Sequence, residues 1–429
     1  MTDFEVASIL ISLTAGLAYF NARVLRLPSA IGLMATALVG SLIVLGLDAL
    51  DVTDVAPRVS ALLDHVNLSY ALLHGMLGLL LFAGALHVDL GDLRAYRLPI
   101  TVLALGGTAL STAIVGVVSY FVLGAMGLEL SLVHCLLFGA LISPTDPIAV
   151  LGILKAAKAP KSLEVTITGE SLFNDGVGVV FFLAIYGVAA GDEVTAGSIL
   201  RLFVQEAIGG ALFGMALGYV GYRLLKSIDQ YSVEILITLA IVLGGYVAAE
   251  NLHVSAPIAA VAAGLLIGNQ GRAFAMSDTT RDHLDTFWEL IDEILNAVLF
   301  LLIGLEVVRL QLGLELLVAS AVMIPLVLFA RWSSVAIPLA ALPKFRGQAR
   351  GAVTLLTWGG LRGGISVALA LSLPSGPERN VILVITYSIV VFSILIQGTT
   401  LGRLTRRFAT EAPSSALGVP GGGVDSTVR

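Results

Sequence analysis

The sequence predicts an all-α polytopic membrane protein with about thirteen transmembrane helices. Hydrophobic residues make up 57% of the 429 residues and charged residues only 13%, whereas soluble domains carry roughly a quarter charged residues. Apolar segments recur along the whole chain at lengths that suit spans of roughly 20 residues. Two of these segments are interrupted by proline or glycine beside a charged residue. Lipid is therefore the expected solvent of most of the surface.

The apolar segments define the predicted spans. The N-terminus is acidic and has no basic segment before the first apolar run, which indicates a retained span rather than a cleaved signal peptide. The ninth segment is short and the tenth begins with polar residues, so a count one lower stays open. In chain order, the predicted spans are 4–22, 29–47, 69–88, 98–124, 131–154, 164–190, 197–224, 231–250, 254–269, 285–307, 313–341, 349–373 and 379–402.

Positive charge alternates between the loops that join these spans. By the positive-inside rule, this alternation places the C-terminus in the cytoplasm and the N-terminus in the periplasm, in a bacterial inner membrane. The less basic loops hold only Arg58, Arg201, Arg309 and Arg379. The basic loops hold Arg23 and Arg26; Arg94 and Arg97; Lys155, Lys158 and Lys161; Arg223 and Lys226; Arg272 and Arg281; Lys344, Arg346 and Arg350; and Arg403, Arg406 and Arg407.

The predicted span 131–154 is interrupted by Ser143-Pro144-Thr145-Asp146-Pro147. Two prolines three residues apart remove two amide donors and prevent helical geometry between them. Carbonyl groups freed in this way are tolerated in a membrane only where they line a cavity or meet other polar groups. A simple proline kink is the alternative, but an aspartate is poorly suited to a purely mechanical role. We therefore expect Thr145 and Asp146 to belong to a functional site.

The predicted span 164–190 begins with a polar face. Glu170 and Asn174 are four residues apart, as are Ser171 and Asp175, so a helix places all four side chains on neighbouring turns. A fully hydrogen-bonded structural network is the alternative, and we expect Glu170 to be paired. A second buried carboxylate has no such explanation. Because desolvation disfavours the charged form, Asp175 is suited to exchanging a proton for a cation near neutral pH.

Two arginines also fall inside predicted spans. Arg331 lies in 313–341, and Arg362 is flanked by two glycines on either side in 349–373. A buried guanidinium needs carboxylate or carbonyl partners, and Glu170 is the expected counter-ion for one of them. The glycines predict a second helix break. Both arginines are expected to neutralise the scaffold of the site.

The two breaks fall in the fifth and twelfth predicted spans, at equivalent positions of two six-helix halves. The single span between the halves inverts the second half relative to the first. Broken helices at matched positions of inverted repeats indicate a transporter's binding site, a pattern already known from a sodium/proton antiporter. We therefore predict two inverted six-helix repeats with two broken, crossing helices. Asp146 would then offset amide ends at the crossing and Arg362 carbonyl ends.

These motifs resemble the monovalent cation:proton antiporter family, in particular NhaP-type sodium/proton antiporters and the related eukaryotic sodium/proton exchangers. The resemblance covers about residues 4–405. It rests on three segments in order, with a further match at 300–306: Ser143-Pro144-Thr145-Asp146-Pro147, Gly169-Glu170-Ser171-Leu172-Phe173-Asn174-Asp175-Gly176 and Gly359-Gly360-Leu361-Arg362-Gly363.

The resemblance implies a role for each motif residue. Asp175 would bind the ion and the proton, with Thr145, Ser171 and Glu170 in the cation site, where Asp175, Ser171 and Thr145 would ligate transported Na+. The remaining assignments concern the scaffold: Asp146 would stabilise the crossing, Glu170 would pair with Arg331, and Asn174 would pair with Arg362. An asparagine before the key aspartate is typical of electroneutral relatives, so Asn174 implies exchange of one proton for one cation.

The resemblance also implies a homodimer and a division of the chain. We expect a single transmembrane antiporter domain over 1–407, with a mobile core formed by 98–190 and 313–402 and a dimerisation domain formed by the remaining spans. Residues 408–429 are rich in Gly, Ser, Pro and Ala and predict a short disordered cytoplasmic tail. The long regulatory domain of the animal exchangers is not expected.

Sodium/proton antiport, serving pH homeostasis, is the function these features favour, with Li+ as a further cargo. A potassium/proton antiporter differs only in pocket size and stays open, as does an ion channel. An intramembrane enzyme is disfavoured, because no catalytic pair or zinc motif is found. Cys135 is the only cysteine and the six histidines lack ligand spacing, so no cofactor is expected. The expected partners are the lipid bilayer and small cations, and no nucleic acid.

Overall fold

The computed structural model describes residues 2–50, 55–66, 68–157, 159–189, 196–341 and 349–409. All regular secondary structure in these ranges is helical, which confirms the predicted all-α class. The predicted tail, 408–429, lies outside the described residues apart from its first two positions.

The first half of the chain runs through the helices that carry the proline break. Several helices follow one another without interruption through a short π-helical stretch (η). In order, the elements are α1 (Asp3–Phe20), η1 (Asn21–Leu25), α2 (Ser29–Ala49), α3 (Val55–Val66), α4 (Leu68–Tyr70), η2 (Ala71–Met76), α5 (Leu77–Leu86), α6 (Leu90–Ala95), α7 (Arg97–Thr101), η3 (Val102–Gly107), α8 (Thr108–Ala125), α9 (Leu132–Ile142), α10 (Ile148–Ala156) and α11 (Lys161–Ala189).

The second half carries the glycine break. Its elements are α12 (Ala196–Phe203), η4 (Val204–Ile208), α13 (Gly209–Leu225), α14 (Tyr231–Asn251), α15 (Ala256–Leu266), η5 (Ile267–Gly271), α16 (Arg272–Phe274), α17 (Asp278–Glu306), the 3-10 turn η6 (Val307–Arg309), α18 (Leu314–Ala341), α19 (Ala349–Trp358), α20 (Gly364–Ser372), α21 (Pro377–Phe392), η8 (Ser393–Gln397) and α22 (Gly398–Ala409).

Nine helices in the described part of the chain are long and apolar enough to cross a membrane, by length and composition. They correspond to nine of the predicted spans. The other four predicted spans are also helical but differ in kind: 131–154 and 349–373 are broken, 254–269 is short, and α17 begins with many charged residues. The chain is therefore a multi-pass membrane protein, while the full count of thirteen and the inverted repeats stay predictions.

One helix was not expected. The sequence predicted a loop between the spans 29–47 and 69–88, but α3 occupies Val55–Val66 within it. This helix buries Ala56, Leu62 and Leu63 on one side. Its polar residues, among them Asp64, lie on the other, so the segment is amphipathic and too short to appear as a span.

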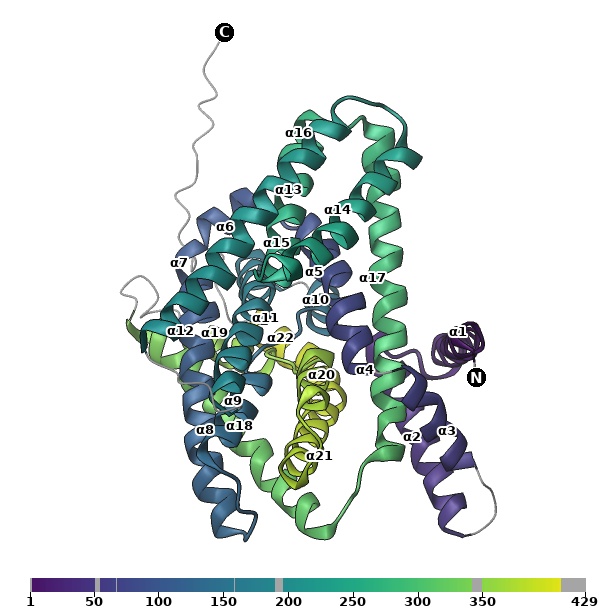
Figure 1. The fold of residues 1–429 in the computed structure, drawn as a ribbon, viewed down its shortest axis with the longest axis vertical. Helices are drawn as coiled ribbons and strands as arrows, with labels where there is room; N and C mark the ends of the chain where they lie inside the picture. The colour runs from purple at the N-terminus through teal and green to yellow at the C-terminus, as the bar shows by residue number, and fades with distance from the viewer. Residues whose placement is uncertain are drawn as a thin grey trace.

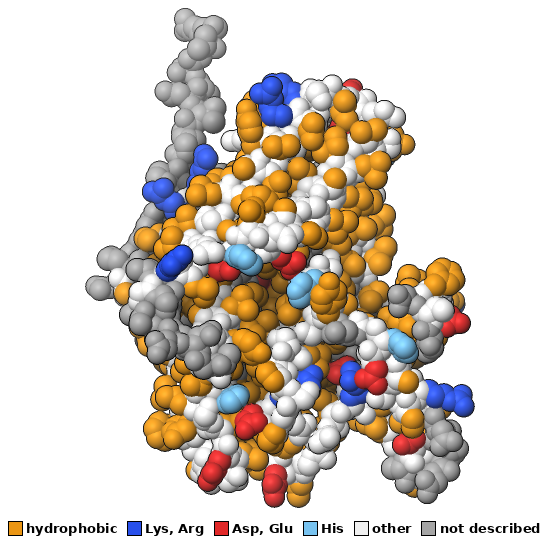
Figure 2. Space-filling view, viewed as in Figure 1, with side chains coloured by type: hydrophobic (Ala, Val, Ile, Leu, Met, Phe, Trp, Pro, Cys, Tyr) orange, Lys and Arg blue, Asp and Glu red, His pale blue; other side chains and the backbone are white. Residues whose placement is uncertain are grey.

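The helices pack in two groups. In one, α8 packs against α9 and α18, and α18 and α20 pack against α21; in the other, α13 and α5 pack against α15, and α17 packs against α2 and α5. Figure 1 shows α17 as a long rod on the right of the view, beside α14 and α4. Figure 2 shows apolar side chains spread over much of the visible face. Leu212, Tyr219 and Leu236 are among the exposed apolar residues. Such a surface suits lipid contact.

Candidate ion-binding site

Two helix breaks meet in the interior. The first separates α9 from α10 at Ser143–Pro147, and the second separates α19 from α20 at Gly359–Gly363. The backbone amide of Asp146 donates a hydrogen bond to the carbonyl of Leu361 at 2.8 Å. This bond joins the two non-helical segments directly, so the predicted crossing of broken helices is present.

Close backbone packing holds the crossing together. A Cβ atom on Gly178 of α11 would lie 2.2 Å from the Pro144 ring, and one on Gly363 would lie 2.5 Å from an Asp146 carboxylate oxygen. Contacts under 3.0 Å require a neighbour to shift, so only glycine fits these positions. The two glycines therefore allow the proline break to approach α11 closely and the two breaks to approach each other.

The Arg362 side chain covers the carbonyl groups freed by the prolines. Its Nη1 donates to the carbonyl of Ser143 and, at 2.9 Å, to the carbonyl of Pro144. The backbone amide of Arg362 donates to Ser393 Oγ at 3.0 Å. Arg362 is 2% exposed. A buried cation is tolerated there because two carbonyl dipoles face its Nη1, as expected for its place at carbonyl ends.

A buried ion pair lies beside the crossing. Both terminal nitrogens of Arg331 donate to the two carboxylate oxygens of Glu170, one of them at 2.9 Å. Nη2 of Arg331 also donates to the carbonyl of Leu356 at 3.1 Å. The expected pairing of Glu170 with Arg331 is therefore present, and it ties α11 to α18 and α19 in the bidentate geometry favoured by guanidinium and carboxylate.

The partner of Asn174 differs from the expectation. Asn174 was expected to pair with Arg362, but its Nδ2 donates to Thr145 Oγ1 at 2.9 Å and its Oδ1 accepts from the Thr145 amide at 3.2 Å. Arg362 instead takes the carbonyl groups at the break. The physical reason is that the non-helical segment offers both an amide and a hydroxyl to Asn174. Thr145 Oγ1 also lies 2.9 Å from Ser171 Oγ.

A cavity of about 620 Å³ reaches this site. Asp175, which is 5% exposed, lines it together with Thr145, Asp146 and Ser366. The residues described along its wall do not include Glu170, Ser171 or Asn174. In this conformation Ser171 lies behind Thr145. The carboxylate of Glu170 is engaged by Arg331, so its expected place in the cation site is not what the geometry supports.

The sequence interpretation missed two cavity residues on α17. Asp292 and Asn296 belong to the polar start of the predicted span 285–307, which was not assigned to the site, but both line the cavity that Asp175 lines. Asn296 is 6% exposed, and its Nδ2 donates to the carbonyl of Asp292 at 2.8 Å. Their spacing of four residues, immediately before a long apolar run, is the signal that could have identified them as a buried polar face.

The outer part of the same cavity is acidic. Lys155 and Lys161 also lie on its wall, and Lys161 Nζ is 2.7 Å from a carboxylate oxygen of Asp92. Acidic side chains there outnumber these lysines: Asp89, Asp92, Glu164, Asp285 and Glu289. A lining of this sign raises the local concentration of cations. Lys155 and Lys161 belong to a predicted cytoplasmic loop.

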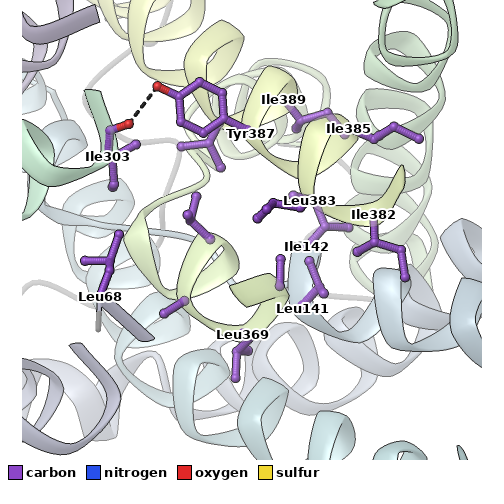
Figure 3. Close-up of a cluster of buried hydrophobic side chains, with 14 of the residues drawn as sticks. Leu68, Leu141, Ile142, Ile303, Leu369, Ile382, Leu383, Ile385, Tyr387 and Ile389 are labelled. Atoms are coloured by element: carbon purple, nitrogen blue, oxygen red, sulfur yellow. Dashed lines mark hydrogen bonds between the residues drawn. The ribbon is translucent and has the colours of Figure 1, made fainter. Parts of the chain in front are cut away.

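An apolar layer closes the other end. Along α17, Asn296 and Leu299 line the cavity, Ile303 lies in a buried apolar cluster, and Glu306 lines a second cavity beyond it. Figure 3 shows this cluster, in which the Tyr387 hydroxyl of α21 donates to the Ile303 carbonyl at 2.6 Å. The labelled members are Leu68, Leu141, Ile142, Ile303, Leu369, Ile382, Leu383, Ile385, Tyr387 and Ile389. The layer separates the Asp175 cavity from the second one.

The arrangement suits a small hard cation. Asp175 supplies a carboxylate and Thr145 a hydroxyl at the inner end of the cavity, and oxygen ligands of this kind are preferred by hard cations. Asp175 is also the group that a proton would neutralise. The site therefore offers one position to two alternative positive charges.

Comparisons with known proteins agree with this geometry. Residues 9–407 match the model of the family described as "Sodium/hydrogen exchanger, transmembrane". The chain is 51% identical over 414 residues to the Na(+)/H(+) antiporter NhaP of Pseudomonas aeruginosa, covering 95% of this chain and 98% of that protein. It is 36% identical over 392 residues to the Na(+)/H(+) antiporter NhaH of Halobacillus dabanensis, covering 90% and 93%.

A solved structure shares the fold. The sodium proton antiporter MjNhaP1 from Methanocaldococcus jannaschii, determined at pH 8, superposes with a TM-score of 0.73 at 17% sequence identity. The match covers 93% of this chain and 96% of that one. At this identity the likeness concerns the fold alone.

Proposed function

Because this chain belongs to the sodium/hydrogen exchanger family, we propose that it exchanges Na+, or Li+, for protons across the inner membrane of a bacterium. The exchange centres on Asp175. Its carboxylate takes either one proton or one cation, because protonation removes the charge that attracts the cation. Competition for one group is enough to couple the two fluxes.

The single observation that carries this proposal is the place of Asp175. The residue is only 5% exposed, yet it lines a cavity together with Thr145 and Asp146. A buried charge without a load is costly to move through an apolar environment. Either load neutralises the carboxylate, so only the loaded site moves between the two sides.

Alternating access is supported by the apolar layer. The Asp175 cavity includes Lys155 and Lys161 of a basic loop, while the Ile303–Tyr387 layer closes the opposite end. With basic loops on the cytoplasmic side, this conformation is open to the cytoplasm, the N-terminus is periplasmic and the C-terminus is cytoplasmic. In the opposite conformation the layer would part and the cavity would close.

An electroneutral exchange of one proton for one cation follows from the neighbours of Asp175. Asn174 is neutral and hydrogen-bonds Thr145, so it brings no second proton. Glu170 is held by both terminal nitrogens of Arg331, so it is engaged in this ion pair and not in the exchange. We assign Asp146, Asn174, Arg331 and Arg362, together with Glu170, to the scaffold. Asp175 and Thr145 bind the ion, and Ser171 supports Thr145 from behind.

The moving part is proposed to be the core of 98–190 and 313–402, which holds both breaks. The remaining spans would form the dimerisation domain of a homodimer within the transmembrane domain 1–407. Potassium/proton exchange is a separate candidate that no observation favours, since the similar proteins above are named for sodium. A channel would need no group for which two ions compete.

The test uses purified protein in liposomes that contain a pH-sensitive dye. We expect NaCl and LiCl to drive proton movement, KCl to drive little, and Asp175→Asn to abolish all of it. Asp278→Asn is the matched control, because the Asp278 side chain is 95% exposed on α17, and it should keep wild-type rates. Sodium-driven proton flux that survives in Asp175→Asn would refute the assignment, and a response to KCl alone would refute sodium as the cargo.

A further inference from the structure

A second buried carboxylate lies beyond the apolar layer. Glu306 is the last residue of α17, and its side chain is 2% exposed. It lines the second cavity, of about 1050 Å³, whose wall also includes residues from the start of α18 and of α21. The exchange mechanism described above makes no use of this group.

The arginines around Glu306 are engaged elsewhere. Arg309 Nη1 lies 3.5 Å from Glu306 Oε1, which is longer than a good hydrogen bond, while Arg309 Nη2 donates to Asp64 of α3 at 2.7 Å. Arg379 of α21 donates to Ser375 Oγ at 3.2 Å and to the Leu371 carbonyl at 3.0 Å. Both guanidinium groups therefore attract Glu306 without completing its hydrogen bonds.

One carboxylate oxygen of Glu306 has no hydrogen bond within the part of the chain that the structure describes. Oε2 is buried and has no hydrogen-bond partner among the described residues. Two further groups face this region: the Tyr387 hydroxyl, which donates to Ile303, and Glu315 of α18, which is exposed on the cavity wall. A buried ionised oxygen without a donor is costly.

The end of α17 adds a further cost to the ionised form. The last carbonyl groups of a helix carry partial negative charge. Two of them are bonded from the side, Ile303 by Tyr387 of α21 and Gly304 by Ser41 of α2, at 2.9 Å. These bonds fix the helix end in place, so Glu306 remains next to the negative end of its own helix. A proton on Oε2 relieves both costs.

We propose that Glu306 is a second proton-binding site, on the mouth of the transporter opposite to the Asp175 cavity. When ionised, Glu306 attracts Arg309 and Arg379 and so holds α21 against the end of α17. Protonation removes this attraction and lets the mouth open. Acid on this side therefore raises the exchange rate. The effect on rate rests on the proposed antiport, whereas proton binding by Glu306 does not.

Infrared spectroscopy of protein in lipid tests the site itself. The comparison is between Asp175→Asn and Asp175→Asn/Glu306→Gln, so that the exchange carboxylate is silent in both. We expect the first to show a carboxylic-acid C=O band that titrates with pH and the second to lack it. No titrating difference between the two proteins would overturn the proposal, even if both the fold and sodium exchange by the wild type are intact.

Exchange in oriented proteoliposomes tests the consequence. With the pH varied only on the Glu306 side, the wild-type rate should rise towards acid pH, and Glu306→Gln should lose this rise while keeping its response on the other side. Glu315→Gln, in the exposed residue of the same cavity, should behave as the wild type. A Glu306→Gln profile like that of the wild type would overturn the proposal.

Asp64→Asn tests the same site without changing a buried side chain. The Asp64 side chain is 62% exposed, so this substitution should not disturb the fold. Removing its charge frees Arg309 to hold Glu306 more closely, which favours the ionised form. The acid-side profile should shift to lower pH. A shift to higher pH, or no shift, would contradict the role given to Arg309 and Glu306.

Discussion

Asn174 and Thr145 are joined by two hydrogen bonds, one from the amide nitrogen of Asn174 to Thr145 Oγ1 at 2.9 Å and one from the Thr145 backbone to Asn174 Oδ1 at 3.2 Å. These bonds span from the regular helix α11 to the break between α9 and α10. They hold the non-helical segment against α11, so that Thr145 and Asp175 line the same cavity.

Asn174→Ala removes both bonds and leaves the Thr145 hydroxyl less well placed. A net contribution of about 1 kcal/mol for each of the two hydrogen bonds predicts a KM for Na+ raised by roughly thirtyfold, with a smaller effect on the maximum rate. Proton flux measured as a function of sodium concentration gives both the KM and the maximum rate. Asn251→Ala, in an exposed asparagine that bonds only to its own helix, is the control. An unchanged KM would contradict a positioning role for Asn174.

Glu170→Gln should destabilise the protein, because Arg331 is then left buried and unpaired. Breaking one partner of a buried ion pair costs about 3–5 kcal/mol. The melting temperature in detergent should fall for Glu170→Gln and for Arg331→Met, while the double variant should recover part of the loss. If each single variant has the melting temperature of the wild type, the ion pair does not hold α11 to α18.

Gly178→Ala should displace the proline break, because the added Cβ would lie 2.2 Å from the Pro144 ring. We expect a protein that still inserts but exchanges sodium far more slowly. Gly152→Ala is the matched control, since a Cβ there meets nothing within 4 Å. Equal activity of the two variants would show that the approach of α11 to the break is not required.

Tyr387→Phe removes the hydroxyl that bonds the Ile303 carbonyl at 2.6 Å across the apolar layer. Losing this bond weakens the closed side, so we expect a cysteine introduced in place of Ser366, which lines the Asp175 cavity, to be labelled more readily from the periplasmic face. Tyr219→Phe, on an exposed tyrosine, should leave labelling unchanged. Labelling of Tyr387→Phe at the wild-type rate would contradict a sealing role for the layer.

Local chemistry explains which features the sequence predicts well. Pro144 and Pro147 remove amide donors, and the glycines around Arg362 weaken a helix, so both breaks lie where they were expected. The cost of burying charge also predicts that Glu170 is the counter-ion of one of the two buried arginines, whereas the choice of Arg331 came from the resemblance to the antiporter family. The breaks and the need for a counter-ion therefore follow from the chain itself.

Features that depend on how distant segments approach were not predictable. The partner of Asn174 is decided by the presentation of the Thr145 amide and hydroxyl at the break. Asp292 and Asn296 lie in the middle of α17, and only the placement of α17 beside α5 and α20 turns them towards the Asp175 cavity. Sequence spacing predicts that a helix has a polar face, but it does not predict which other helices or which cavity that face contacts.

The central claim is that Na+ and a proton compete for Asp175, and calorimetry of Na+ binding at several pH values tests it most directly. Because the protonated carboxylate must release its proton before the cation binds, the apparent Kd should rise about tenfold for each pH unit on the acid side, with close to one proton released per Na+ bound. Asp175→Asn should lose both effects. A Kd that is independent of pH, or proton release that persists in Asp175→Asn, would contradict the account.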